Sequence, residues 1–269
     1  MKKWLCAGVL LFVSLAGLMA QGRLTLKVAG VDTGRKGYTN ELITQALKLE
    51  GYTARFQFIG KMPNSRQEIL LASGDISFMN FGVTADRDAK FIRIPVRTSD
   101  GLIGKRIFFI PKGTQKDYDG VRTLQDYRKL NKVSGLGKSW ADVDIWEANH
   151  LKHMDVDGDW KVLFRMVEAK NRGVDNFPRG AAEFIAEVPH HPDLDIEKNL
   201  VLVYDMDNAV YVTPKDPRLA VILDKALKTA EKNGLIKKLV SQFYRQAFKA
   251  PINVDKRIQI YLDVPKTKN

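Results

Sequence analysis

Two arginines stand where a cation can bind an anion. Arg87 lies one turn into a short predicted helix that Thr84 is expected to cap, and Arg179 lies in another turn between a predicted strand and a predicted helix. A cation beside the free backbone amides of a helix start binds carboxylate or phosphate groups well. We therefore predict an anion clamp made by these two arginines. The alternative for Arg87 is a surface ion pair with Asp86 or Asp88.

A third polar turn, GLGKSW over 135–140, precedes a helix predicted over 141–150. A phosphate-binding P-loop needs a longer glycine frame closed by Lys-Ser/Thr, so the match to that motif is weak. A glycine turn at a helix start still favours a polar ligand site, and Ser139, Trp140 and Asp142 are its candidates. Trp140 either stacks on a ligand or fills the core.

His150, His153 and the aspartates of DVDGDW (155–160) suggest a metal site only weakly. An EF-hand loop has Gly at position six and Glu at position twelve, whereas this segment has Gly158 at four and Met166 at twelve. A histidine pair without a third ligand is also weak evidence for zinc. We predict a solvated turn here, and neither a metal nor a cofactor.

Strands and helices alternate along the chain, which is typical of an α/β fold with a parallel sheet covered by helices. A strand over 24–28 precedes a helix over 38–49, and the pattern restarts after a strand over 103–110. The segments 219–230 and 235–248 have the apolar spacing of amphipathic helices. The polar turns 82–87, 137–142 and 177–180 follow strands, at the sheet edge where open α/β folds bind ligands.

The first twenty residues have the pattern of a secretory signal peptide. Lys2 and Lys3 precede an uncharged apolar run that ends in small residues, with cleavage expected after Ala20 or, alternatively, after Ala16. The formal charge of the 269-residue chain is +12, and it becomes +10 without the two lysines of this segment. Export and the scattered basic residues argue against nucleic acid as a partner. We expect a periplasmic monomer.

The chain resembles the family-3 extracytoplasmic solute-binding proteins of amino-acid ABC importers, which have the type-2 periplasmic binding fold. The resemblance is carried by the leader, YTNELITQALKLEG (38–51), LLASGDISFMNFGVTADR (70–87) and VYVTPKDPRLAVILDKALKTAEKNG (210–234). The segments FIRIPVRTSDGLIGKR, GLGKSWADVDIW and RGVDNFPRGAAEFIAEV are similar to a less characterised branch with an FPRS motif, in which Gly180 replaces the final serine.

The resemblance implies two α/β lobes joined by two crossover strands and closing on a solute. The implied segments are a signal peptide (1–20), a first lobe (23–108 and 206–262), a second lobe (111–203) and a tail (263–269). In the family, the arginine of the Thr84-x-x-Arg87 turn holds the ligand carboxylate. The family's serine-rich pocket strand is replaced here by a segment that includes Asn80 and Gly82, and Tyr38 either lines the first-lobe side or packs.

The implied function is capture of a small anionic or amino-acid-like solute for a membrane permease of an ABC importer. One alternative is a solute-sensing subunit for a membrane signalling protein. A less favoured alternative is a periplasmic dehydratase-like enzyme on the same fold, for which Asp142 and Glu183 are the carboxylates nearest the turns.

Overall fold

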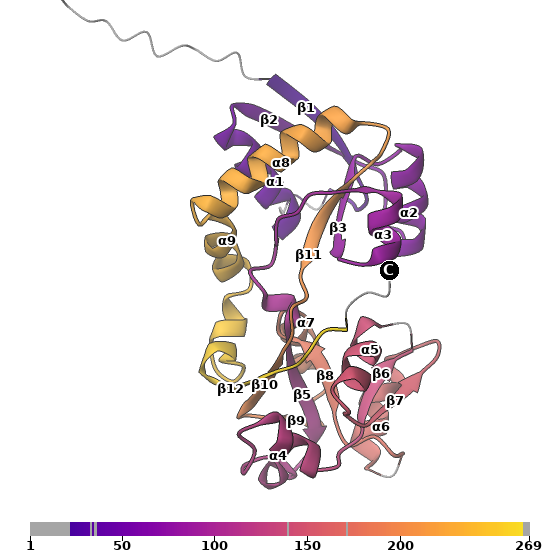
Figure 1. The fold of residues 1–269 in the computed structure, drawn as a ribbon, viewed down its shortest axis with the longest axis vertical. Helices are drawn as coiled ribbons and strands as arrows, with labels where there is room; N and C mark the ends of the chain where they lie inside the picture. Colours follow the sequence, from indigo (N-terminus) through magenta and orange to yellow (C-terminus); the bar gives the residue numbers. More distant parts are fainter. Residues whose placement is uncertain (1–21, 33, 35–36, 139, 171, 266–269) are drawn as a thin grey trace, which may run out of the picture.

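The computed structural model describes residues 22–265 apart from 33, 35–36, 139 and 171, so the predicted signal peptide lies outside the described residues. Figure 1 shows two lobes, one above the other, with the chain passing between them beside β11 and β5. Within the described part of the chain, every helix is too short or too polar to cross a membrane.

The first lobe, drawn at the top of Figure 1, contains a parallel strand pair and a three-stranded sheet. Its strands are β1 (Gly22–Val28), β2 (Tyr52–Phe58), β3 (Phe78–Gly82), β4 (Ile92–Arg93) and β11 (Asn208–Val212). Its helices are α1 (Tyr38–Leu49), α2 (Asn64–Ser73), α3 (Ala85–Lys90), α8 (Pro217–Lys232) and α9 (Leu235–Phe243). The strand β11 runs antiparallel to both β3 and β4, because it carries the chain back from the second lobe. The predicted parallel pairing is therefore observed for β1 with β2, whereas β11 pairs with β3 and β4 in antiparallel register.

The second lobe is built around β5 (Lys105–Pro111), whose residues are almost all buried. Its other strands are β6 (Ser134–Gly137), β7 (His153–Val156), β8 (Phe177–Gly180), β9 (Leu194–Ile196), β10 (Leu200–Val203) and β12 (Ile258–Tyr261). Its helices are α4 (Leu124–Lys129), α5 (Ala141–Ala148), α6 (Val162–Ala169) and α7 (Ala181–Glu187). The strands β8, β9 and β10 all pair with β5 in antiparallel register.

Apolar spacing explains the main helices. In α1 the predicted face of Leu42, Ile43, Ala46 and Leu47 is buried, and it packs against the buried face of α8. The helix predicted over 235–248 ends earlier, at Phe243, and is followed by the short 3₁₀ segment η4 (Arg245–Phe248). A second 3₁₀ segment, η5 (Val254–Lys256), leads into β12.

Strand pairing near the lobe boundary differs from the predicted boundaries, which placed 206–262 in the first lobe. In the structure, β12 pairs in parallel with β10, within the β5 sheet. Buried Arg257 fixes this segment, donating to the carbonyl oxygens of Ile252 at 2.6 Å and Leu200 at 3.0 Å. We therefore propose that 22–103 and 207–243 form the first lobe, and that 105–203 and 245–262 form the second.

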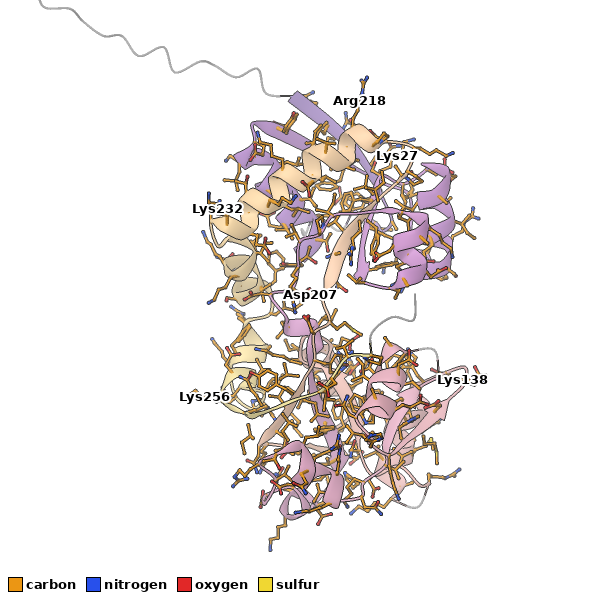
Figure 2. The ribbon with its side chains drawn as sticks, viewed as in Figure 1. Lys27, Lys138, Asp207, Arg218, Lys232 and Lys256 are labelled. Atoms are coloured by element: carbon orange, nitrogen blue, oxygen red, sulfur yellow. The ribbon has the colours of Figure 1, made fainter. Side chains whose placement is uncertain are left out.

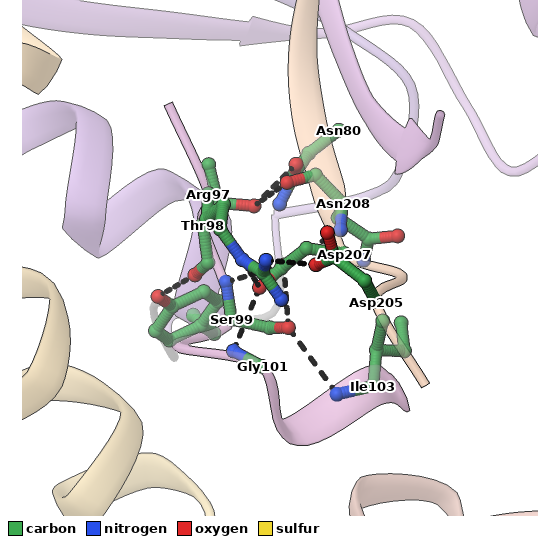
Figure 3. A network of polar contacts seen from close by, with 10 residues as sticks. Asn80, Arg97, Thr98, Ser99, Gly101, Ile103, Asp205, Asp207 and Asn208 are labelled. Atoms are coloured by element: carbon green, nitrogen blue, oxygen red, sulfur yellow. Dashed lines mark hydrogen bonds and ion pairs between the residues drawn. The ribbon is translucent and has the colours of Figure 1, made fainter. Parts of the chain in front are cut away.

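A buried carboxylate ties together the two crossover segments (Figure 3). Asp207 accepts hydrogen bonds from the backbone N–H groups of Ser99 at 2.8 Å and Gly101 at 2.7 Å, and from the Ser99 hydroxyl at 2.6 Å. Close by, Gly104 has no room for a side chain, because an added Cβ would lie 2.2 Å from the carbonyl oxygen of Tyr204. The crossover segments therefore pack backbone against backbone.

Candidate ligand cleft

A cavity of about 670 Å³ lies between the two lobes. Thr84 and Ala85, at the start of α3, line it from the first lobe. Asp144 and Glu147 of α5 line it from the second lobe, and Met206 lines it from the crossover. In Figure 1, α3 lies directly above α5. Because both lobes and the crossover contribute walls, the volume of this cavity depends on the angle between the lobes.

A second hollow, of about 300 Å³, adjoins the first one on the second lobe. The two hollows share the lining residues Ala141 and Met206, and we refer to them together as the cleft. The second hollow is lined by Trp140, Trp160 and Arg179, together with Arg106, Asp142 and Glu183. The predicted turns 137–142 and 177–180 therefore meet at one hollow.

Arg87 occupies the predicted position, and its partners come from elsewhere in the first lobe. Thr84 caps α3 by accepting a hydrogen bond from the backbone N–H of Arg87 at 3.3 Å, as predicted. The Arg87 guanidinium donates to the Glu68 carboxylate at 2.9 Å and to the carbonyl oxygen of Gly82 at 2.8 Å. Its side chain stays 20% exposed. The alternative of pairing with Asp86 or Asp88 is not what the structure shows, because α2 brings Glu68 closer.

Arg179 is enclosed far more completely. It lies within β8, one residue before the N-cap Gly180 of α7, and its side chain is 8% exposed. The guanidinium carbon lies 4.4 Å from the ring centroid of Trp160 and 5.0 Å from that of Trp140. Glu187 accepts three hydrogen bonds from it, at 2.6, 2.9 and 3.1 Å. An aromatic cage with an internal carboxylate therefore already holds the charge of Arg179.

Asp142 is also committed within the chain. Arg106 donates to both of its carboxylate oxygens, at 2.6 and 3.1 Å, and the Tyr204 hydroxyl donates to one of them. Burial alone would raise the pKa of Asp142, but the charge of Arg106 and these hydrogen bonds outweigh it and hold the pKa below its usual value. Burial, with Asp142 nearby, also raises the pKa of Tyr204 well above its usual value. Asp142 is therefore an ionised, saturated acceptor.

The first-lobe candidates around β3 form part of the crossover network. The Asn80 side-chain amide donates to Thr39 at 3.2 Å, and its oxygen accepts from the Thr98 hydroxyl at 2.9 Å (Figure 3). Tyr38 is buried, its hydroxyl donates to the carbonyl oxygen of Thr98, and burial raises its pKa. Gly82 contributes its carbonyl oxygen to Arg87. Tyr38 and Asn80 thus link the first lobe to the crossover.

Two candidates lie in the glycine turn. Ser139 lies outside the described residues. Trp140 is half-buried and stacks over Phe177, with ring centroids 6.0 Å apart. Gly137 makes room for it, because an added Cβ there would lie 2.6 Å from the indole. Trp140 therefore packs against the second-lobe core and also lines the hollow, and its stacking on a ligand stays a prediction.

The sequence analysis missed three residues that line the cleft, Arg106, Trp160 and Met206. It also missed Glu187, which pairs with Arg179, and Tyr204, which donates to Asp142. Arg106 left a signal, because a cation inside an apolar strand requires a buried carboxylate partner. Trp160 and Glu187 left none, because they reach Arg179 only through tertiary packing. The aspartates of DVDGDW act as ordinary acceptors, with Asp155 2.7 Å from a ring nitrogen of His153. Among the described residues, no three potential metal ligands come together.

Several solved structures are similar to this chain over most of its length. YckB from Bacillus subtilis has a TM-score of 0.54 at 21% identity, covering 89% of this chain and 97% of its own. A mutant of ArgBP from T. maritima has a TM-score of 0.51 at 15% identity, with coverages of 83% and 96%. The ancestral amino-acid-binding protein AncCDT-1, a precursor of cyclohexadienyl dehydratase, also has a TM-score of 0.51 at 15% identity, with coverages of 82% and 95%.

No protein-family model and no curated protein sequence matches the chain. The likeness is therefore one of fold, carried over nearly the whole length of each neighbour. With its two lobes and a cavity between them, the chain has the fold of the type-2 periplasmic solute-binding proteins.

Proposed function

We propose that this protein captures a small polar, amino-acid-like solute between its lobes and delivers it to the membrane permease of an ABC importer. The observation that carries the proposal is the cavity of about 670 Å³ lined by both lobes and by the crossover. Small-molecule sites typically measure about 300–1,000 Å³. A ligand that bridges both walls stabilises the closed arrangement of such lobes.

The charges of the cleft bear on the solute. Asp144 and Glu147 line the cavity, and no cation is among the described residues that line it. Arg87 and Arg179 each already have a carboxylate partner, but Arg87 is the more exposed of the two. A zwitterion fits this arrangement better than a simple anion. Its ammonium group would face α5, and its carboxylate would compete with Glu68 for Arg87.

A sensing subunit remains the second candidate, because the same closure could be presented to a signalling protein instead of a permease. Enzymatic activity is a weaker candidate. AncCDT-1 is the precursor of a dehydratase, but here Asp142 is saturated by Arg106 and Tyr204. Glu183 is the remaining carboxylate of the second hollow, and a general acid–base pair needs two such groups.

The experiment combines native mass spectrometry of protein purified without refolding with a thermal-shift screen. The screen compares α-amino acids, dicarboxylates without an amine, and diamines without a carboxylate. We expect α-amino acids to raise the melting temperature most, because a ligand at about 100 times its Kd stabilises by about 2.7 kcal/mol. The absence of both a retained solute and any thermal shift would overturn the proposal. Loss of solute uptake in a deletion strain would separate the importer from the sensor.

A further inference from the structure

One edge of the molecule carries six exposed cations. They come from the end of α8, from α9, from η4 and the residue after it, and from η5. We call them the basic edge: Lys232, Lys237, Lys238, Arg245, Lys249 and Lys256. Residues 231–256 contain only two acids, Glu231 and Asp255. This short stretch therefore has an excess of four positive charges, a third of the +12 of the whole chain.

Packing forces these cations to face outward together. Ile236, Leu239 and Val240 fix the buried face of α9, so Lys237 and Lys238 lie on its exposed face. In Figure 1, α9 and the segment that follows it form the left margin of both lobes. Figure 2 shows Lys232 beside the upper lobe and Lys256 beside the lower lobe, along this same margin. The basic edge therefore spans both lobes.

These six charges are not neutralised within the described part of the chain, where none of them forms an ion pair. Neighbouring lysines of α8 behave differently, since Lys225 pairs with Glu50 and Lys228 pairs with Asp224, each at 2.8 Å. The positive potential of the basic edge is therefore available to an external partner.

We propose that the basic edge binds an anionic phospholipid surface. Five of its six cations are lysines, compact charges on flexible stems, which suit a diffuse layer of headgroups better than the bidentate geometry that arginine offers to a protein carboxylate. Phe243, 40% exposed at the end of α9, adds an apolar contact among them. The acidic helix α5 lies on the other side of the molecule (Figure 1), so its carboxylates do not face the surface that the basic edge would bind.

The test is co-sedimentation of the purified protein with vesicles of phosphatidylcholine alone or with phosphatidylglycerol added. We expect binding to the anionic vesicles that is lost at high salt, and much weaker binding to the neutral ones. The neutral vesicles also report any binding through apolar segments. The double variant Lys237→Gln/Lys238→Gln should lower the partition coefficient about 25-fold, since each basic residue near such a surface contributes about fivefold.

The matched control is Lys116→Gln/Lys129→Gln, which removes the same charge from exposed positions in the second lobe. We expect it to lower binding less than fivefold, and both variants to keep the wild-type melting temperature. Equal losses in the two variants would show that only total charge matters and would overturn the proposal. An absence of binding to anionic vesicles would also overturn the proposal. The same holds if the basic edge binds an acidic protein but no anionic vesicle. None of these outcomes depends on the solute in the cleft.

Discussion

Arg87 and Arg179 stand at equivalent places in sequence, each near the junction of a strand and a helix, but their surroundings differ. Arg87 has one carboxylate partner and stays 20% exposed, whereas Arg179 is 8% exposed among three aromatic rings and two carboxylates. Under the proposed function, Arg87 is the arginine that would exchange Glu68 for a ligand carboxylate, because it is the more exposed of the two. Arg179 is placed to hold Trp140 and Trp160 in position. A shared local motif therefore does not imply a shared role.

The largest effect expected from this difference is on folding stability. Arg179→Ala leaves Glu187, itself 16% exposed, without its partner and leaves a gap among the rings. Breaking a buried ion pair in this way costs about 3–5 kcal/mol. Urea denaturation measures the loss, with Arg218→Ala at an exposed site as a control that should change little. A cost below about 1 kcal/mol would mean that Arg179 does not hold Trp140 and Trp160 in position.

The second lobe should also be the more sensitive to acid. The pKa of Asp142 is lower in the folded protein than in the unfolded chain, so its stabilisation is complete above about pH 4 and is lost as the pH falls through the folded pKa. Asp142→Asn should cost about 3 kcal/mol at pH 7, the lower end of the cost of breaking a buried ion pair, because the Arg106 charge loses its counter-ion while the amide oxygen can still accept a hydrogen bond. The variant should also show a shallower loss of stability below pH 4. Denaturation curves at several pH values test this. The same decrease in unfolding free energy below pH 4 in the wild type and in the variant would contradict it.

Arg87→Ala should cost less stability, about 1 kcal/mol, because the Glu68 pair is partly exposed. Its effect on solute affinity should be larger, about tenfold to a hundredfold, if a ligand carboxylate uses this guanidinium. Calorimetric titration with the solute identified by the screen measures this. Unchanged affinity would remove Arg87 from the binding site, and a stability loss exceeding that of Arg179→Ala would reverse the comparison.

Local patterns in the sequence were sufficient for much of the fold. The apolar face of α1, the cap at Thr84 and the helix start after Trp140 are all encoded within one or two turns of chain, and all are observed. What the sequence did not reveal depends on distant segments. Glu68 reaches Arg87 from another helix, Trp160 reaches Arg179 across the second lobe, and β12 joins the second-lobe sheet after a long path. Whether a cleft arginine already has a carboxylate partner is thus decided by tertiary contacts and not by the local sequence.

The smallest effect concerns the two threonine caps, one in each lobe. Thr123 caps α4 in a capping box, accepting from the backbone N–H of Asp126 at 3.1 Å while Asp126 accepts from the backbone N–H of Thr123 at 3.1 Å. Thr84 has only the longer contact of 3.3 Å with the backbone N–H of Arg87. We expect Thr123→Ala to cost about 1 kcal/mol and Thr84→Ala about 0.5 kcal/mol.

Thr84 lines the cleft and holds the turn that carries Arg87, whereas Thr123 lies away from it, so Thr84→Ala should weaken solute binding more. Parallel denaturation and titration of both variants test this, and equal effects on affinity would show that the α3 turn does not position Arg87 for the solute.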